Sequence, residues 1–161
     1  MPLLALATGL AATPGRAAAA QPSCTGSLSG AVAARFDCTV TVALAGDGRT
    51  YATISPTAPV EGLPGFAPGS FDVTAVLRPG TWKLDDLGMG KASVAAPGGT
   101  LFTATRTTGQ RGEVTLVWKR LKKLDGGRWG VSGSYRARLL PVGAGKTGEV
   151  LVAVDFEGQG G

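Results

Sequence analysis

The chain has 161 residues, of which 43% are hydrophobic and 17% charged, and its formal net charge is +5. This length suits one domain with a single core, and the apolar content argues against intrinsic disorder. The 26 glycines and 10 prolines fall mainly between runs of alternating apolar and polar residues, which is typical of short strands joined by turns. We therefore expect one all-β domain of about 9–10 antiparallel strands, with little or no helix.

Residues 1–20 have the features of a signal peptide. Pro2 to Ala12 form an apolar run too short to span a bilayer, and Ala18-Ala19-Ala20 offer a small-residue cleavage site before Gln21. No Lys or Arg precedes the apolar run, which leaves the true start of the signal open, and a frayed alanine-rich tail is the alternative. We expect an exported chain, secreted, periplasmic or at the cell surface, with its single domain in residues 21–161 and no transmembrane segment in the mature form.

Cys24 and Cys38 are the only cysteines. In an exported chain such a pair is most simply a disulfide, which would close a loop of about 15 residues and stabilise the fold by roughly 3 kcal/mol. Two buried free thiols are the alternative. A zinc site is disfavoured because the chain has no histidine. We predict a Cys24–Cys38 disulfide, no metal site and no cofactor.

In the first half of the chain, apolar and polar residues alternate in several short segments. A first hairpin is expected over residues 26–32 and 35–44, and a third strand over residues 49–55. The prolines and glycines of residues 56–69 exclude a sheet ladder and predict a surface crossover, with Leu63 and Phe66 beneath it. Further strands are expected over residues 70–77, 81–84, 91–96 and 100–107, the last two paired across Pro97-Gly98-Gly99.

The longest alternation lies in residues 113–140. Val114, Leu116 and Trp118 mark one face of its first limb, and Tyr135 lies on the same face of its second limb. The Asp-Gly-Gly sequence between the limbs suits a two-residue hairpin loop. A last strand over residues 149–157 should pair with the second limb. These strands predict an antiparallel β-sandwich, with a closed β-barrel of lipocalin-like type as the alternative.

Gly143-Ala144-Gly145-Lys146-Thr147 superficially resembles the end of a phosphate-binding P-loop. That loop needs a glycine three residues earlier, where this chain has Leu140, and a helix directly after the Lys-Thr pair, where a strand is predicted. We expect a plain hairpin turn and no nucleotide ligand.

Few residues are candidates for catalysis. Without histidine there is no Ser-His-Asp triad and no Cys-His pair, and the chain also lacks asparagine. Paired carboxylates remain open: Asp85 and Asp86 are adjacent, although a solvated loop explains them better than a calcium site. Other carboxylates could approach one another in space, namely Asp37, Asp72, Glu149 and Asp155. We predict no enzyme, no catalytic residue and no cofactor-binding residue.

Aromatic and basic residues supply the candidate binding features. Trp82 and Trp129 lie next to turns and are candidates for a ligand platform, whereas Trp118 and Tyr135 should pack in the core. The densest charge feature is a basic ribbon suited to an anionic partner. Its members are Lys119, Arg120, Lys122, Lys123, Arg128, Arg136 and Arg138. Protection of an exposed strand edge is the favoured explanation of this ribbon.

In composition the chain is similar to exported bacterial β-sandwich proteins that have a short signal, one disulfide and strands rich in Gly, Thr and Val. Immunoglobulin-like domains differ, because their cysteines enclose a longer stretch that contains a tryptophan. We expect a non-enzymatic binding or structural module whose partner is a polysaccharide, an anionic cell-surface polymer or a protein. A lipocalin-like carrier of a small apolar ligand is the alternative, and a carboxylate-dependent hydrolase is the weakest hypothesis.

Overall fold

The computed structural model describes residues 23–44, 50–63, 66, 71–76, 78–83, 89–104 and 112–160. The predicted signal peptide and the Asp85-Asp86 pair lie outside the described residues. The described part contains ten strands and one short 3-10 turn, η1 (Asp125–Gly127), so the all-β prediction is confirmed. The strands are β1 (Ser23–Gly30), β2 (Ala34–Leu44), β3 (Thr50–Pro56), β4 (Phe71–Val76), β5 (Gly80–Lys83), β6 (Met89–Ala95), β7 (Leu101–Ala104), β8 (Glu113–Lys123), β9 (Trp129–Pro141) and β10 (Val150–Gly160).

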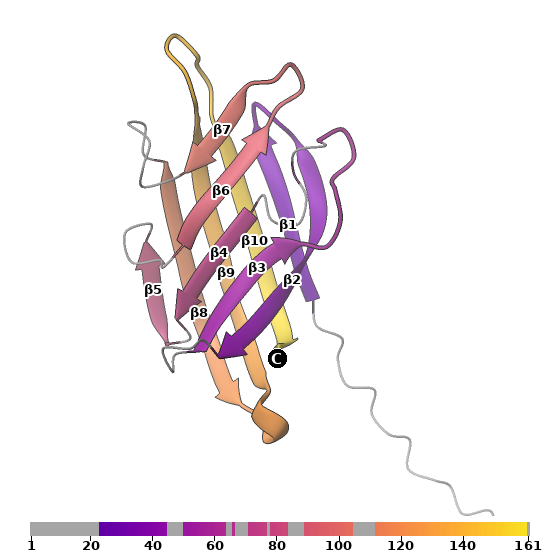
Figure 1. Cartoon of the computed structure of the whole chain (residues 1–161), viewed down its shortest axis with the longest axis vertical. Helices are drawn as coiled ribbons and strands as arrows, with labels where there is room; N and C mark the ends of the chain where they lie inside the picture. Colours follow the sequence, from indigo (N-terminus) through magenta and orange to yellow (C-terminus); the bar gives the residue numbers. More distant parts are fainter. Residues whose placement is uncertain are drawn as a thin grey trace, which may run out of the picture.

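The strands form one curled antiparallel sheet. Its order is β10-β1-β2-β3-β4-β6-β7-β9-β8-β5, and β9 also pairs with β10. The sheet curls so that β3, β4 and β6 cross in front of β8, β9 and β10 (Figure 1). The predicted pairings of β1 with β2, β6 with β7, β8 with β9 and β9 with β10 are all present.

The core lies between the front and back strands. Alternate residues of β8, β9 and β10 are buried, as the sequence pattern predicts. One buried cluster combines Ile54 and Val94 from the front strands with Tyr135, Leu139 and Val152 from the back strands. Tyr135, Ile54 and Leu139 are fully buried, so large side chains lie inside the curled sheet.

The predicted disulfide is present and marks the point where β2 changes partner. Residues 34–37 of β2 pair with β1, and residues 38–44 pair with β3. Cys38 is the first residue after the change, and it is bonded to Cys24 of β1. The covalent link therefore holds β1 to β2 where the hydrogen-bonded ladder between them ends.

The β8–β9 hairpin departs from the predicted two-residue loop. Five residues, 124–128, connect the strands, and the amide of Leu124 donates to the carbonyl of Arg128 at 2.8 Å. Gly126 and Gly127 both have positive φ, so the Asp-Gly-Gly signal for the turn was correct although the loop is longer. A register shift between Trp118 and Arg120 also interrupts the alternation of β8.

Two aromatic rings from neighbouring strands meet over a glycine of β9. Gly133 is paired with Trp118 of β8 on one side and with Phe156 of β10 on the other. The rings of Trp118 and Phe156 lie edge to face with their centroids 5.3 Å apart. A Cβ atom at Gly133 would lie 2.6 Å from the Phe156 ring and closer still to the carbonyl oxygen of Val117. The ring contact therefore requires glycine at position 133.

We expect Gly133→Ala to lower the free energy of unfolding by about 1–3 kcal/mol, because an extra methyl group overpacks this contact. Urea denaturation measures the effect. Gly130→Ala on the same strand is the control, because its Cβ would meet its nearest atom at 3.7 Å, an ordinary contact. Equal losses of stability in the two variants would contradict the proposed role of Gly133.

A second prediction concerns Tyr135, whose burial raises the pKa of its phenol far above the ordinary value. In the folded protein this phenol stays neutral, whereas in the unfolded chain it ionises above about pH 10. Stability should therefore be fully present well below that pH, and by pH 11 the ionisation of this one group in the unfolded chain should have removed about 1.4 kcal/mol. Tyr135→Phe should flatten the fall of unfolding free energy above pH 10. If the free energy of unfolding falls with pH equally in variant and parent, the proposed role of the Tyr135 phenol is wrong, because the two proteins share all other titrating groups.

Candidate binding surface

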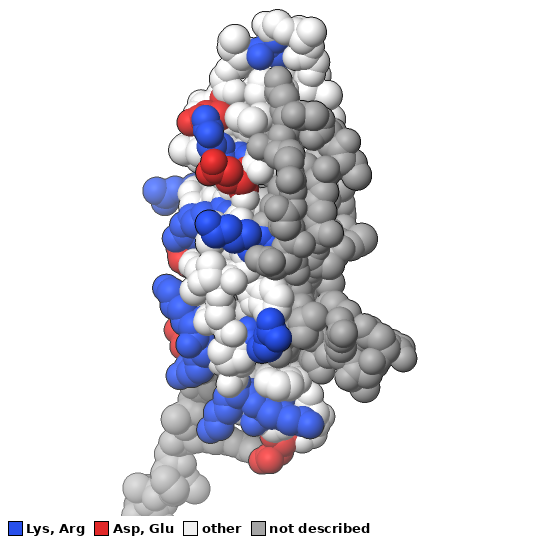
Figure 2. Space-filling view, turned by 90° about the vertical axis from the view of Figure 1, so that its left-hand side faces the viewer, with Lys and Arg blue, Asp and Glu red and all other residues white. Residues whose placement is uncertain are grey.

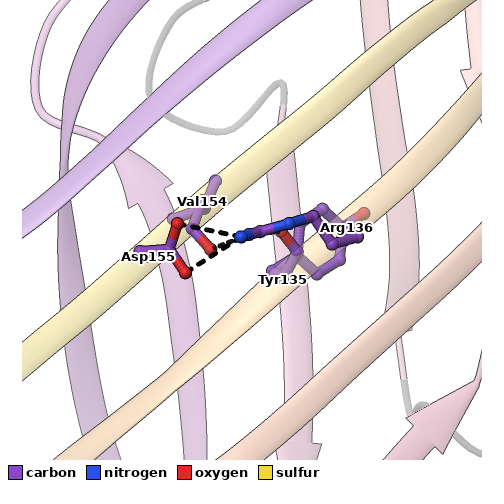
Figure 3. A network of polar contacts seen from close by, with 4 residues as sticks. All are labelled: Tyr135, Arg136, Val154 and Asp155. Atoms are coloured by element: carbon purple, nitrogen blue, oxygen red, sulfur yellow. Dashed lines mark hydrogen bonds and ion pairs between the residues drawn. The ribbon is translucent and has the colours of Figure 1, made fainter.

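The predicted basic ribbon lies on β8, on β9 and on the connection between them, and the structure divides that ribbon into two parts. Arg136 reaches from β9 across to β10 (Figure 3). Its guanidinium binds both carboxylate oxygens of Asp155, at 2.9 and 3.0 Å. It also donates to the carbonyl oxygens of Val154 and Tyr135, at 2.7 and 2.9 Å. The charge of Arg136 is therefore neutralised within the sheet.

Two further arginines of the ribbon are neutralised in the same way. Arg138 donates to Glu149 at 2.6 Å and lies 3.9 Å from Glu113, and its hydrogen bond to Glu149 raises its pKa. Arg120 binds Glu157 at 2.7 Å. These pairs are exposed, so each contributes little to stability. Their effect is that this part of the ribbon offers little net positive charge to a partner.

The remaining lysines lie toward the end of the β8–β9 hairpin. Lys119, Lys122 and Lys123 are exposed and make no ion pair with any residue that the structure describes. We call these three residues the lysine tip. Arg128 lies beside them on the connection, where its Nε–H points to the carbonyl oxygen of Asp125 at 3.5 Å. Lys and Arg side chains gather along this side of the molecule (Figure 2).

The sheet topology explains why the lysine tip is open to solvent. Along the edge that faces away from β9, β8 pairs with β5, but only from Thr115 to Trp118. Beyond Trp118, no described strand pairs with that side of β8. The lysine tip therefore follows an exposed strand edge, a position where lysines discourage sheet-to-sheet aggregation. This placement fits edge protection as well as a surface for an anionic partner.

The two candidate platform tryptophans do not form a common surface. Both are partly buried and pack against the core. Trp82 is paired with Leu116, and the guanidinium of Arg78 covers its ring at 4.9 Å. Trp129 is paired with Lys123, seven residues further along β8. At about 3.3 Å per residue the two lie roughly 23 Å apart along the strand, too far to stack on one sugar ring.

Two of the hollows lined by described residues differ in place and character. The larger, about 660 Å³, is open and polar and lies on the outer face of β10, β1 and β2. The smaller, about 180 Å³, lies beside the disulfide and is lined in part by Val40 and Val131. The larger hollow brings Asp37 together with Arg35 and Glu61. The sequence does not single out Arg35 or Glu61, because no local pattern shows that residues 57–61 fold back beside β2.

The structure also bears on the P-loop-like sequence, on metal binding and on membrane-spanning helices. Gly143 to Gly148 form the turn between β9 and β10, so the strand predicted after Lys146-Thr147 is present. Among the described residues no group of three or more His, Cys, Asp or Glu side chains could hold a metal ion. The described part of the chain contains no helix long and apolar enough to cross a membrane.

No protein-family model, no curated protein and no solved structure matches this chain.

Proposed function

We propose that the chain is a non-catalytic binding module that works outside the cytoplasm and holds an anionic polymer against the lysine tip. The observation that carries this proposal is the division of the basic ribbon. Arg120, Arg136 and Arg138 are held by neighbouring carboxylates, whereas the three lysines are exposed without an acidic partner among the described residues. A set of unpaired positive charges on a projecting hairpin is suited to a polyanion, which gains by releasing its counterions.

We also infer that the curled sheet functions as a filled sandwich and not as a hollow lipocalin-like carrier. The ladders differ in length: β9 and β10 share eleven residue pairs, whereas β7 and β9 share only two. A ladder as short as that between β7 and β9 is expected where a sheet turns a corner between two layers. The fully buried Tyr135, Phe66 and Leu116 occupy the interior. Both features favour a packed interior with binding on the outside.

Export and the absence of catalysis are supported from the sequence. A Cys24–Cys38 disulfide persists in oxidising compartments, and residues 1–20 resemble a signal peptide. The chain has no histidine, so the commonest general base is missing. Without Arg16 of the proposed signal peptide the formal net charge falls from +5 to +4, which still favours attraction to anionic polymers at a cell surface.

A dextran sulfate column tests the proposal. The Lys122→Gln, Lys123→Gln double variant should bind dextran sulfate about tenfold more weakly at physiological salt, because two contacts are removed. The slope of log affinity against log salt should fall by about two. The control is the Arg35→Gln, Lys146→Gln double variant, which loses the same net charge from other surfaces.

The control distinguishes a local site from general charge attraction. If both double variants lose affinity equally, the lysine tip is not a site and only the net charge matters. If the lysine variant keeps its affinity but aggregates, edge protection is the role of these lysines and the proposal is wrong.

A further inference from the structure

The polar hollow on the outer face of the sheet is a groove with a floor and a wall. We call it the β1 groove, because small side chains of β1, Thr25 and Ser27, form the middle of its floor. Arg35 and Asp37 of β2 are paired with them on one side, and Ala153 and Asp155 of β10 on the other. Residues 57–61 form the wall and complete a volume of about 660 Å³. This is within the range of small-ligand sites in proteins.

The wall is fixed in place by the core. The amide and the hydroxyl of Thr57 both donate to the carbonyl oxygen of Asp37, at 3.0 and 3.2 Å. Three residues on, the amide of Val60 donates to the carbonyl of Phe66. The Phe66 ring is fully buried and packs edge to face against Phe36 with 4.9 Å between centroids. The groove therefore exists before any ligand binds, which limits the entropy lost on binding.

Charged side chains beside the groove and at its margin form ion pairs, whereas those inside it have no ion-pair partner among the described residues. On the adjoining face, Arg120, Arg136 and Arg138 are each paired with a carboxylate, and Arg136 takes up Asp155 at the groove margin. Arg35, Asp37 and Glu61 line the groove, yet their side chains make no ion pair or hydrogen bond with any described residue. One guanidinium and two carboxylates are thus left for a partner that carries charges of both signs.

We propose that the β1 groove binds a zwitterionic ligand, a short peptide with a free ammonium group and a free carboxylate. The carboxylate binds the Arg35 guanidinium in the bidentate manner that this pair favours. The ammonium group binds Asp37 and Glu61, and the hydroxyls of Thr25 and Ser27 face the peptide amides. Arg35 and Asp37 are two residues apart on one strand, about 7 Å, and a dipeptide or tripeptide spans about 7–10 Å.

The lining disfavours a neutral sugar. Sugar sites stack pyranose rings on open aromatic faces, whereas Phe36, the one aromatic side chain among the lining residues, is 7% exposed. A polyanion is also disfavoured, because the two unpaired carboxylates would repel it. The β1 groove is therefore separate from the lysine tip both in place and in the ligand chemistry that it fits.

Titration of the full domain with triglycine, followed by amide NMR shifts, tests the proposal. Triglycine should shift residues of β1, β2 and the 57–61 wall. Triglycine amide, which lacks the carboxylate, and N-acetyltriglycine, which lacks the ammonium group, should each bind roughly tenfold more weakly. Arg35→Gln should abolish the preference for triglycine over its amide. Asp37→Asn with Glu61→Gln should abolish the preference for triglycine over its acetylated form.

The Lys122→Gln, Lys123→Gln variant is the control and should bind triglycine as the parent does, so failure of this proposal is distinct from failure at the lysine tip. The proposal is overturned if triglycine at about 10 mM, ten times a millimolar Kd, shifts no groove residue. It is also overturned if the two blocked peptides bind as well as triglycine, a comparison that needs no variant. Binding of maltotriose in place of triglycine at the same residues would overturn it as well.

Discussion

The contact of Trp118 and Phe156 across Gly133 is the constraint on which the sheet depends. Of the described strands, β9 has three partners, because it pairs with β10 on one side and with both β8 and β7 on the other. Gly133 lies in the part of β9 that is held on both sides. A side chain there would separate the rings of β8 and β10 and loosen both ladders. Glycine, usually weak in a strand, is here a condition of close packing.

If the interior is filled, as we propose, binding falls to the outer surface. On the outer face of β8, β9 and β10, cross-strand pairs such as Arg136 with Asp155 remove most of the free charge. Two sets of charged side chains are left without such partners among the described residues. The lysine tip carries one sign on an exposed edge, and the β1 groove carries both signs above a floor of hydroxyls. The two surfaces therefore fit different ligand chemistries.

Features encoded by neighbouring residues could be predicted from the sequence. Alternation located β8, β9 and β10, and the Asp-Gly-Gly turn located the hairpin. Two cysteines in a chain that we expect to be exported predicted their disulfide bond. Features set by contacts distant in sequence could not be predicted. Nothing local places β5 beside β8, shifts the register after Trp118, or brings residues 57–61 beside Asp37. Likewise, the sequence does not show that Arg136 lies beside an acidic residue of a neighbouring strand, or that Lys122 has no such neighbour among the described residues.

The central claim is that the space inside the curled sheet is occupied by side chains, so that ligands bind only outside. Fluorescence titration with Nile red, an uncharged apolar dye, tests this claim most directly, because a hollow carrier would take up the dye and the charged surfaces would not. The account predicts no saturable rise in dye emission with the folded protein. Saturable binding of one dye per chain, with a blue-shifted emission that is lost on unfolding, would contradict it.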